Sequence, residues 1–142
     1  MNYTWLIFAL LSAFFAALVA IFGKVGLQNL DTNTATAIRA VVMTIFLFVI
    51  IALQGKLSQI STIMSCNKAV LFIILSGVSG GLSWLFYFYA IKLGDVNKVV
   101  PIDRLSIIFA VLLAFIFLGE KITIKVAIGA ALIAIGAIFV AI

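Results

Sequence analysis

Five long apolar stretches make up almost the whole of this chain. They cover residues 4–22, 34–53, 69–91, 99–118 and 124–142. Each has close to the roughly 20 residues that a helix needs to cross a hydrocarbon core of about 30 Å. With 67% of its 142 residues hydrophobic and only 9% charged, the chain carries more apolar surface than a water-soluble fold of this length can bury. The stretches are too long for membrane strands and none alternates with a period of two, so we predict an all-α integral membrane protein with five transmembrane helices in a single domain, residues 1–142.

The first stretch could be mistaken for a secretory signal peptide. Its leading segment, Met1 to Thr4, carries no lysine or arginine, and the apolar run that follows is longer than a signal core. We therefore expect a retained transmembrane helix.

Residue types that are scarce or absent exclude several classes of function. The single cysteine, Cys66, excludes an internal disulfide, and the absence of histidine removes the commonest metal ligand and general base. We therefore expect no metal site and no cofactor. The segment from Gly77 to Gly81 matches the Gly-x-Ser-x-Gly nucleophile pattern, but every lysine lies in or beside a loop, so no base is at hand and close helix packing is the better interpretation. No catalytic residue is expected, and the protein is not predicted to be an enzyme.

The distribution of positive charges does not specify the orientation of the chain in the membrane. The net charge of +5 comes from residues scattered singly near helix ends, which indicates contact with lipid head groups and not nucleic acid. Five crossings put Lys56, Lys68, Lys121 and Lys125 on one side, against Lys24, Lys92 and Lys98, with Arg39 and Arg104 a short way inside their helices, on the other. Because orientation follows an excess of Lys and Arg in short loops, it is weakly specified here.

Two interpretations of this balance stay open. Copies could insert both ways and pair as an antiparallel homodimer, giving a ten-helix unit with the inverted-repeat symmetry of many secondary transporters. Alternatively, partners or the insertion machinery fix a small bias, and the chain works as a parallel or other oligomer or as a lone five-helix unit.

The third stretch carries a face of small and hydroxyl residues that ends in an aromatic group. Sites for organic molecules combine aromatic walls with few polar groups, and aromatic faces attract cations. Ser83, Trp84 and Tyr87 are therefore candidates to line a substrate cavity. The alternative for Trp84 and Tyr87 is the interfacial aromatic belt.

Charged residues inside two stretches are the remaining candidates for the cavity. Pro101 is expected near the first turn of the fourth helix, which would put Asp103 close to the positive end of the helix dipole and on one face with Ser106. Arg39 is expected about a turn and a half into the second helix, on the same side of the membrane. Such residues are usually paired or functional. Arg39 and Asp103 could line a cavity mouth, with Asp103 as a coupling acid, or they could form a salt bridge, or Arg39 could extend to the head groups, as Arg104 is expected to do.

Gly129 and Gly136, seven residues apart in the fifth stretch, let two helices cross closely and are our candidate dimer face. Packing within one subunit is the competing explanation.

The order of several segments resembles the EamA-type branch of the drug/metabolite transporter superfamily, in its short members made of a single five-helix unit. The segments are Phe88–Asp95, Val99–Asp103, Phe117–Lys121 and Gly129–Ile133. The resemblance implies a ten-helix transport unit, built from one chain or two, with a central cavity lined by the third and fourth helices. The glycine pair also looks like the dimerising last helix of the small multidrug resistance exporters, but those use a glutamate in the first helix, which has no acid here.

We therefore predict a membrane transporter of small organic metabolites or drug-like molecules that works by alternating access at a dimer cavity. Its expected partners are a second copy, the lipid bilayer and a small-molecule substrate. The alternative is a non-transporting assembly protein or a subunit of a hetero-oligomeric transporter. The resemblance implies a prokaryotic cell (inner) membrane.

Overall fold

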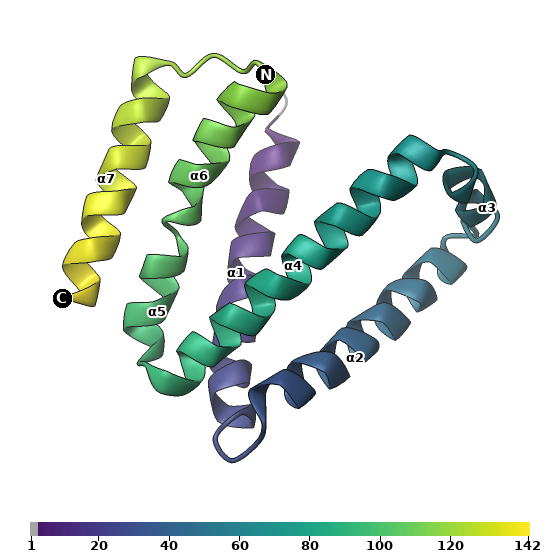
Figure 1. Cartoon of the computed structure of the whole chain (residues 1–142), viewed down its shortest axis with the longest axis horizontal. Coiled ribbons are helices and arrows are strands. Elements are labelled where there is room, and N and C mark those ends of the chain that lie inside the picture. Colours follow the sequence, from purple (N-terminus) through teal and green to yellow (C-terminus); the bar gives the residue numbers. More distant parts are fainter. Residues whose placement is uncertain (1–2) are drawn as a thin grey trace. The chain divides into compact units, whose positions relative to one another are not determined.

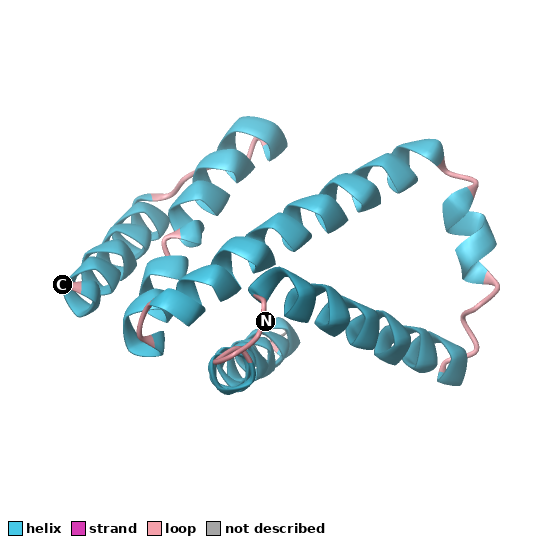
Figure 2. Cartoon of the chain, turned by 60° about the horizontal axis from the view of Figure 1, so that its bottom comes forward, coloured by secondary structure: helices cyan, strands magenta, loops and turns pink. Residues whose placement is uncertain are grey.

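A computed structural model describes residues 3–142 of the chain, and every regular element in that range is a helix (Figures 1 and 2). Five helical segments are long and apolar enough to cross a membrane: α1 (Thr4–Gly26), α2 (Thr32–Leu53), α4 (Asn67–Leu93), Val96–Leu118 and α7 (Ile124–Ala141). The predicted all-α membrane architecture with five spans is thereby confirmed. Met1 and Asn2, at the start of the leading segment, lie outside the described residues.

The helices extend beyond several of the apolar stretches. α1 continues four residues past Phe22, and α4 begins two residues before Ala69 and ends two after Ile91. Hydropathy marks the part of a helix that lies in lipid, whereas backbone hydrogen bonding continues into the polar flanks, where lysines such as Lys24 and Lys92 occupy the last turn. A short helix, α3 (Gln59–Met64), interrupts the segment that the sequence indicated as a loop.

Local capping determines where two of the spans begin. The Asp31 side chain accepts hydrogen bonds from the Thr34 backbone N–H and hydroxyl at 2.8 and 2.7 Å, which satisfies a free donor at the start of α2. The Thr123 hydroxyl caps α7 in the same way, by accepting from the Val126 N–H at 3.4 Å. Both helices therefore begin directly after a polar capping residue on the edge of an apolar run.

The fourth span is not a continuous α-helix. It consists of α5 (Val96–Asp103), α6 (Ser106–Leu113) and a π-helical last turn, η1 (Ala114–Leu118). Between α5 and α6 the backbone bonds tighten, with the Arg104 N–H donating to the Pro101 carbonyl at 3.1 Å. Because Pro101 has no N–H and its ring crowds the carbonyl four residues earlier, it weakens the helical ladder inside α5, shortly before the break.

This break corrects one prediction. Helix α5 starts at Val96 after the N-cap Asp95, three residues before the apolar stretch, so Pro101 lies inside α5 and Asp103 is its last residue. Asp103 therefore does not lie near the positive end of the span's first helix. It occupies the C-terminal end of α5, three residues before the first residue of α6.

The chain divides into two compact units, one made of residues 26–89 and the other of the segment up to Val25 together with residues 90–142. In the second unit, α7 packs against both α5 and α6 (Figure 1). The Lys24 ammonium at the end of α1 donates hydrogen bonds of 2.8 Å to the Ile91 and Gly94 carbonyls. These bonds satisfy the carbonyl of Ile91 in the last turn of α4 and that of Gly94 just after it, and a lysine there also complements the helix dipole.

Few apolar side chains are covered by the chain itself. In each span the buried share of the most apolar window is 17% or less. Phe88 and Ile91, at the end of α4, are exceptions, with 2% and 0% of their surface exposed. The apolar surface of the other helices is therefore available to lipid or to another chain.

Candidate functional site

A cluster of one arginine and two aromatic rings lies in the unit of residues 26–89. The guanidinium carbon of Arg39, the eighth residue of α2, lies 4.2 Å from the ring centroids of both Trp84 and Phe88. The two rings belong to residues four apart on α4, so both come from one face of that helix. A cation at this distance is stabilised by the negative face of each ring, most strongly when water is excluded. The cluster therefore stabilises a positive charge within a membrane span.

Two donors of the Arg39 guanidinium, Nε and Nη2, are closed off from solvent and have no hydrogen-bond partner within residues 3–142. The hydroxyl of Thr32 is in the same condition, while the Thr36 hydroxyl donates to the Thr32 carbonyl at 2.7 Å. Thr32, Thr36 and Arg39 lie at positions i, i+4 and i+7 of α2 and share one face. Buried polar groups are normally paired, so this face of α2 is equipped for a polar partner.

Tyr87 and Ser83 flank the two rings on α4. The Tyr87 ring packs edge-to-face on Phe88, with centroids 5.3 Å apart and an interplanar angle of 78°, and it lies near enough to interact electrostatically with Arg39. Ser83 is exposed. The structure thus brings together three of the residues singled out in the sequence, namely Arg39, Trp84 and Tyr87. Their role in lining a cavity stays a prediction.

Asp103 and Ser106 lie on either side of the break in the fourth span. Asp103 is half-buried, and Ser106 lines an open groove of about 520 Å³ with Arg104, Ile107 and Ile133 among its walls. Asp103 and Arg39 belong to different units of the chain, so a shared cavity mouth and a salt bridge both stay predictions. The coupling role of Asp103 stays one as well.

The candidate dimer glycines have free space around them. A side-chain carbon added at Gly129 or Gly136 would meet no heavy atom of the described chain within 4 Å. The most buried position of α7 is Ala137, and Ala130 and Ala134 are half-buried. Packing within residues 3–142 therefore does not require glycine at either position.

A second groove, of about 420 Å³, is lined by Gly136, Pro101 and Arg104 together with Val100, Ile133, Ala137 and Val140.

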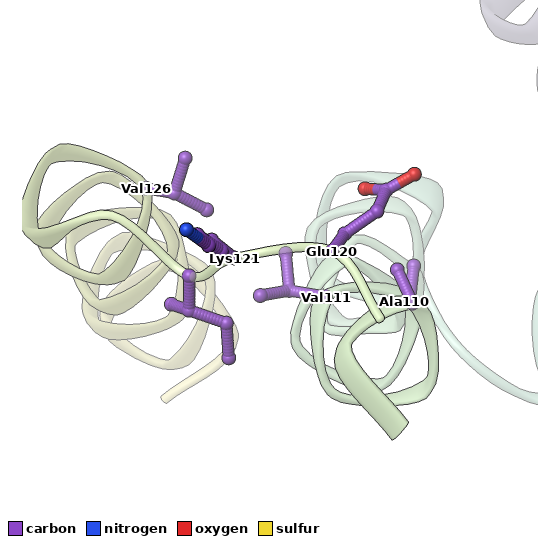
Figure 3. Close-up of a pocket in the computed structure, with 7 residues that line it drawn as sticks. Ala110, Val111, Glu120, Lys121 and Val126 are labelled. Atoms are coloured by element: carbon purple, nitrogen blue, oxygen red, sulfur yellow. The ribbon is translucent and has the colours of Figure 1, made fainter. Parts of the chain in front are cut away.

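A small pocket of about 290 Å³ lies where α6 meets α7, and Figure 3 shows Glu120 and Lys121 on the turn that joins the two helices. Gly119, with φ +67°, ends η1 in the left-handed conformation that glycine adopts without strain. Ala110 and Val111 come from α6 and Val126 from α7, so the pocket walls are apolar below a charged rim. None of the residues predicted to bind substrate lines this pocket.

Sequence reasoning missed two residues of these sites. Phe88 completes the ring pair under Arg39, and its spacing of four residues from Trp84 was the available signal. Arg104, which we expected only to reach the head groups, lines both of the larger grooves. Its position within the helix break, between Asp103 and Ser106, was not predictable from a continuous apolar stretch.

Comparison with known proteins identifies relatives over the full length. Residues 3–142 match the EamA-like transporter family. A protein from Sinorhizobium sp., named as an uncharacterized transporter in the cobO 3′ region, is 43% identical over 142 residues, which is 100% of this chain and 99% of the relative. No solved structure matches the chain.

Proposed function

The chain belongs to the EamA-like transporter family, and we propose that two copies of it carry small organic metabolites or drug-like molecules across the membrane by alternating access at a shared cavity. Family membership and the transporter-named relative support a membrane transporter in general, and they point away from an enzyme. The substrate type and the mechanism are our proposal.

The observation that carries this proposal is the Arg39 cluster. Charged groups inside a membrane span are expensive and mark substrate or ion pathways when they face the protein interior. Here the guanidinium lies 4.2 Å from two aromatic rings and keeps two donors unpaired. An aromatic wall with one charged group is the composition expected of a site for a small organic molecule.

Two features support an antiparallel pair. Because the number of spans is odd, joining two such units head to tail in one chain would automatically give inverted halves, so this chain has the form of one half of an inverted-repeat transporter. Gly129 lies five residues after the start of α7 and Gly136 five residues before its end. In an antiparallel pair of α7 helices that crosses at mid-length, Gly129 of one copy therefore lies opposite the glycine at 136 of the other. The unfilled space at both glycines is compatible with such a close approach.

We assign proton coupling to Asp103. Asp103 is a carboxyl group at a helix break inside a span, and discontinuous helices commonly form transporter ion sites. Asp103 is the only acidic residue between Val96 and Leu118.

Flux measurements test the transport function. Purified protein in liposomes is given a panel of radiolabelled organic acids, amines and neutral amides, with protein-free liposomes as the control. Uptake of any class above the control supports transport. Equal retention of all classes in both preparations would refute it and favour a non-transporting assembly protein or a subunit of a hetero-oligomeric transporter.

Cysteine labelling in intact cells tests the two orientations. In a background without Cys66, single cysteines replace Gln59 at the start of α3 and Asn97 near the start of α5, both of which are exposed. A membrane-impermeant thiol reagent is expected to label a fraction of each variant. Full labelling of one and none of the other would establish a single orientation and contradict the antiparallel pair.

A further inference from the structure

We propose that the substrate carries a carboxylate group, and that this group binds the edge of Arg39 formed by Nε and Nη2. This inference rests on the proposed transport function and names its substrate class. Two observations carry it: the two unpaired donors lie on one edge of the guanidinium, and the neighbouring rings of Trp84 and Phe88 already contact the guanidinium itself.

The two unpaired nitrogens form one recognition edge. Nε–H and the adjacent N–H of Nη2 point in parallel from the same side of the planar guanidinium, and their spacing matches the two oxygens of a carboxylate. Both are closed off from solvent, and neither has a partner in residues 3–142. A planar, bidentate anion is therefore the group that satisfies this edge completely.

The rings beside Arg39 argue against a positively charged substrate. Aromatic side chains in a membrane cavity would suit an organic cation, but here the faces of Trp84 and Phe88 already hold the guanidinium at 4.2 Å. A cationic substrate would compete with Arg39 for the rings and be repelled by its charge. The cluster therefore favours an anion whose apolar body contacts aromatic side chains.

A second polar group lies on the same face of α2. The hydroxyl of Thr32 is buried and without a hydrogen-bond partner in the described chain, and it lies seven residues before Arg39. Seven residues of helix span about 10 Å, which leaves room for a small metabolite between the two groups. Because the Arg39 edge is closed off from solvent, a ligand reaches it when neighbouring side chains move, as alternating access requires.

Arginine NMR tests the carboxylate site without any transport measurement. The chain has two arginines, Arg39 and Arg104, so full-length protein labelled with ¹⁵N-arginine in lipid nanodiscs gives two Nε–H signals. The R104K variant assigns the Arg39 signal. The probes are sodium benzoate and its neutral amide, benzamide, at neutral pH. Benzoate is expected to shift the Arg39 signal in a saturable way, benzamide is not, and the Arg104 signal serves as the internal control.

Variants separate a fork-shaped site from simple charge attraction. R39K keeps the positive charge but lacks the paired donors, and we expect it to weaken benzoate binding about 10- to 100-fold. Since this variant has no Arg39 signal, its binding is followed by the fluorescence of Trp84 in a W5F background, where Trp84 is the only tryptophan. The W5F parent and W5F/R104K, which both keep Arg39, are the matched controls.

Four results would overturn the inference, three from binding measurements and one from transport. One is the absence of any benzoate-dependent shift of the Arg39 signal, and another is undiminished benzoate binding in R39K. The third is a shift of the Arg39 signal in D103N without any probe, because the edge would then belong to an internal pair with Asp103. The fourth is flux of amines alone, which would contradict the carboxylate site while leaving transport intact. Benzoate binding without flux of any compound would instead support the carboxylate site and contradict the transport function.

Discussion

Replacing Lys24 with methionine should destabilise the protein measurably. The Lys24 ammonium is partly buried and donates two hydrogen bonds of 2.8 Å, to the carbonyls of Ile91 and Gly94. Methionine has a similar length and apolar body but no donor, so K24M leaves both carbonyls at the end of α4 without this partner. The substitution also removes a positive charge from the negative end of the α4 dipole.

The expected loss follows from these bonds. A hydrogen bond to a charged group contributes about 1.5 to 3 kcal/mol, and two bonds at the lower figure give about 3 kcal/mol. Water at the membrane boundary can replace part of this, so we expect the free energy of unfolding to fall by about 2 to 3 kcal/mol.

Unfolding by sodium dodecyl sulfate in mixed micelles, followed by far-ultraviolet circular dichroism, measures this difference. K98M is the matched control, because Lys98 is an exposed lysine near the start of α5. We expect K98M to stay within about 0.5 kcal/mol of the wild type, as surface substitutions usually do. A K24M variant as stable as K98M would refute the role assigned to the two hydrogen bonds.

Three further predictions follow from other parts of the chain. G119A should lower the free energy of unfolding by about 1 to 2 kcal/mol in the same assay, because Gly119 has φ +67°. The control G26A, at a glycine without positive φ and with free space around it, should not lower it, and equal stabilities of the two variants would contradict the prediction. D103N should abolish flux driven by a proton gradient in liposomes but preserve benzoate binding; unchanged driven flux would remove Asp103 from coupling. Two lysines added to the loop of residues 54–68 should direct that side to the cytoplasm, while removal of Lys56 and Lys68 should favour the opposite orientation. Cysteine labelling that responds to neither change would contradict weak orientation.

The number and type of the spans were predictable because lipid leaves a chain few options. A backbone in hydrocarbon must satisfy its own hydrogen bonds, so five apolar runs of helix length predict five helices. Their ends were less predictable. The polar flanks of α1 and α4 continue the helix beyond the apolar stretch, and α3 lies in a segment without a long apolar run.

The break in the fourth span shows what hydropathy cannot detect. Apolar character begins at Val99, but the helix begins three residues earlier, after Asp95. Proline was therefore expected in the first turn, where it is harmless, but it lies inside α5, where its missing N–H removes one bond of the helical ladder shortly before the break that precedes Ser106. Whether a proline disturbs a helix depends on the residue at which the helix begins, and hydropathy does not give that residue.

The Arg39 cluster was predictable in part. An arginine inside an apolar stretch and a tryptophan in another each indicate a special environment, and both were selected from the sequence. Their contact, and the contribution of Phe88, depend on how α2 and α4 pack, which no local pattern specifies. The substrate carboxylate at the Nε and Nη2 edge and the second copy at the α7 glycines are our proposals, and no local sequence pattern specifies either.

Disulfide cross-linking along α7 tests the antiparallel pair most directly. In a C66S background, cysteines replace Gly129 and Gly136 singly and together, and the membranes are oxidised. In an antiparallel pair, position 129 of one copy meets position 136 of the other, while identical positions lie about 10 Å apart along the helix axis, beyond disulfide reach. We predict a dimer from the double variant, and from the two single variants expressed together, but not from either alone. Efficient dimers from each single variant would show parallel helices and contradict the inverted transport unit.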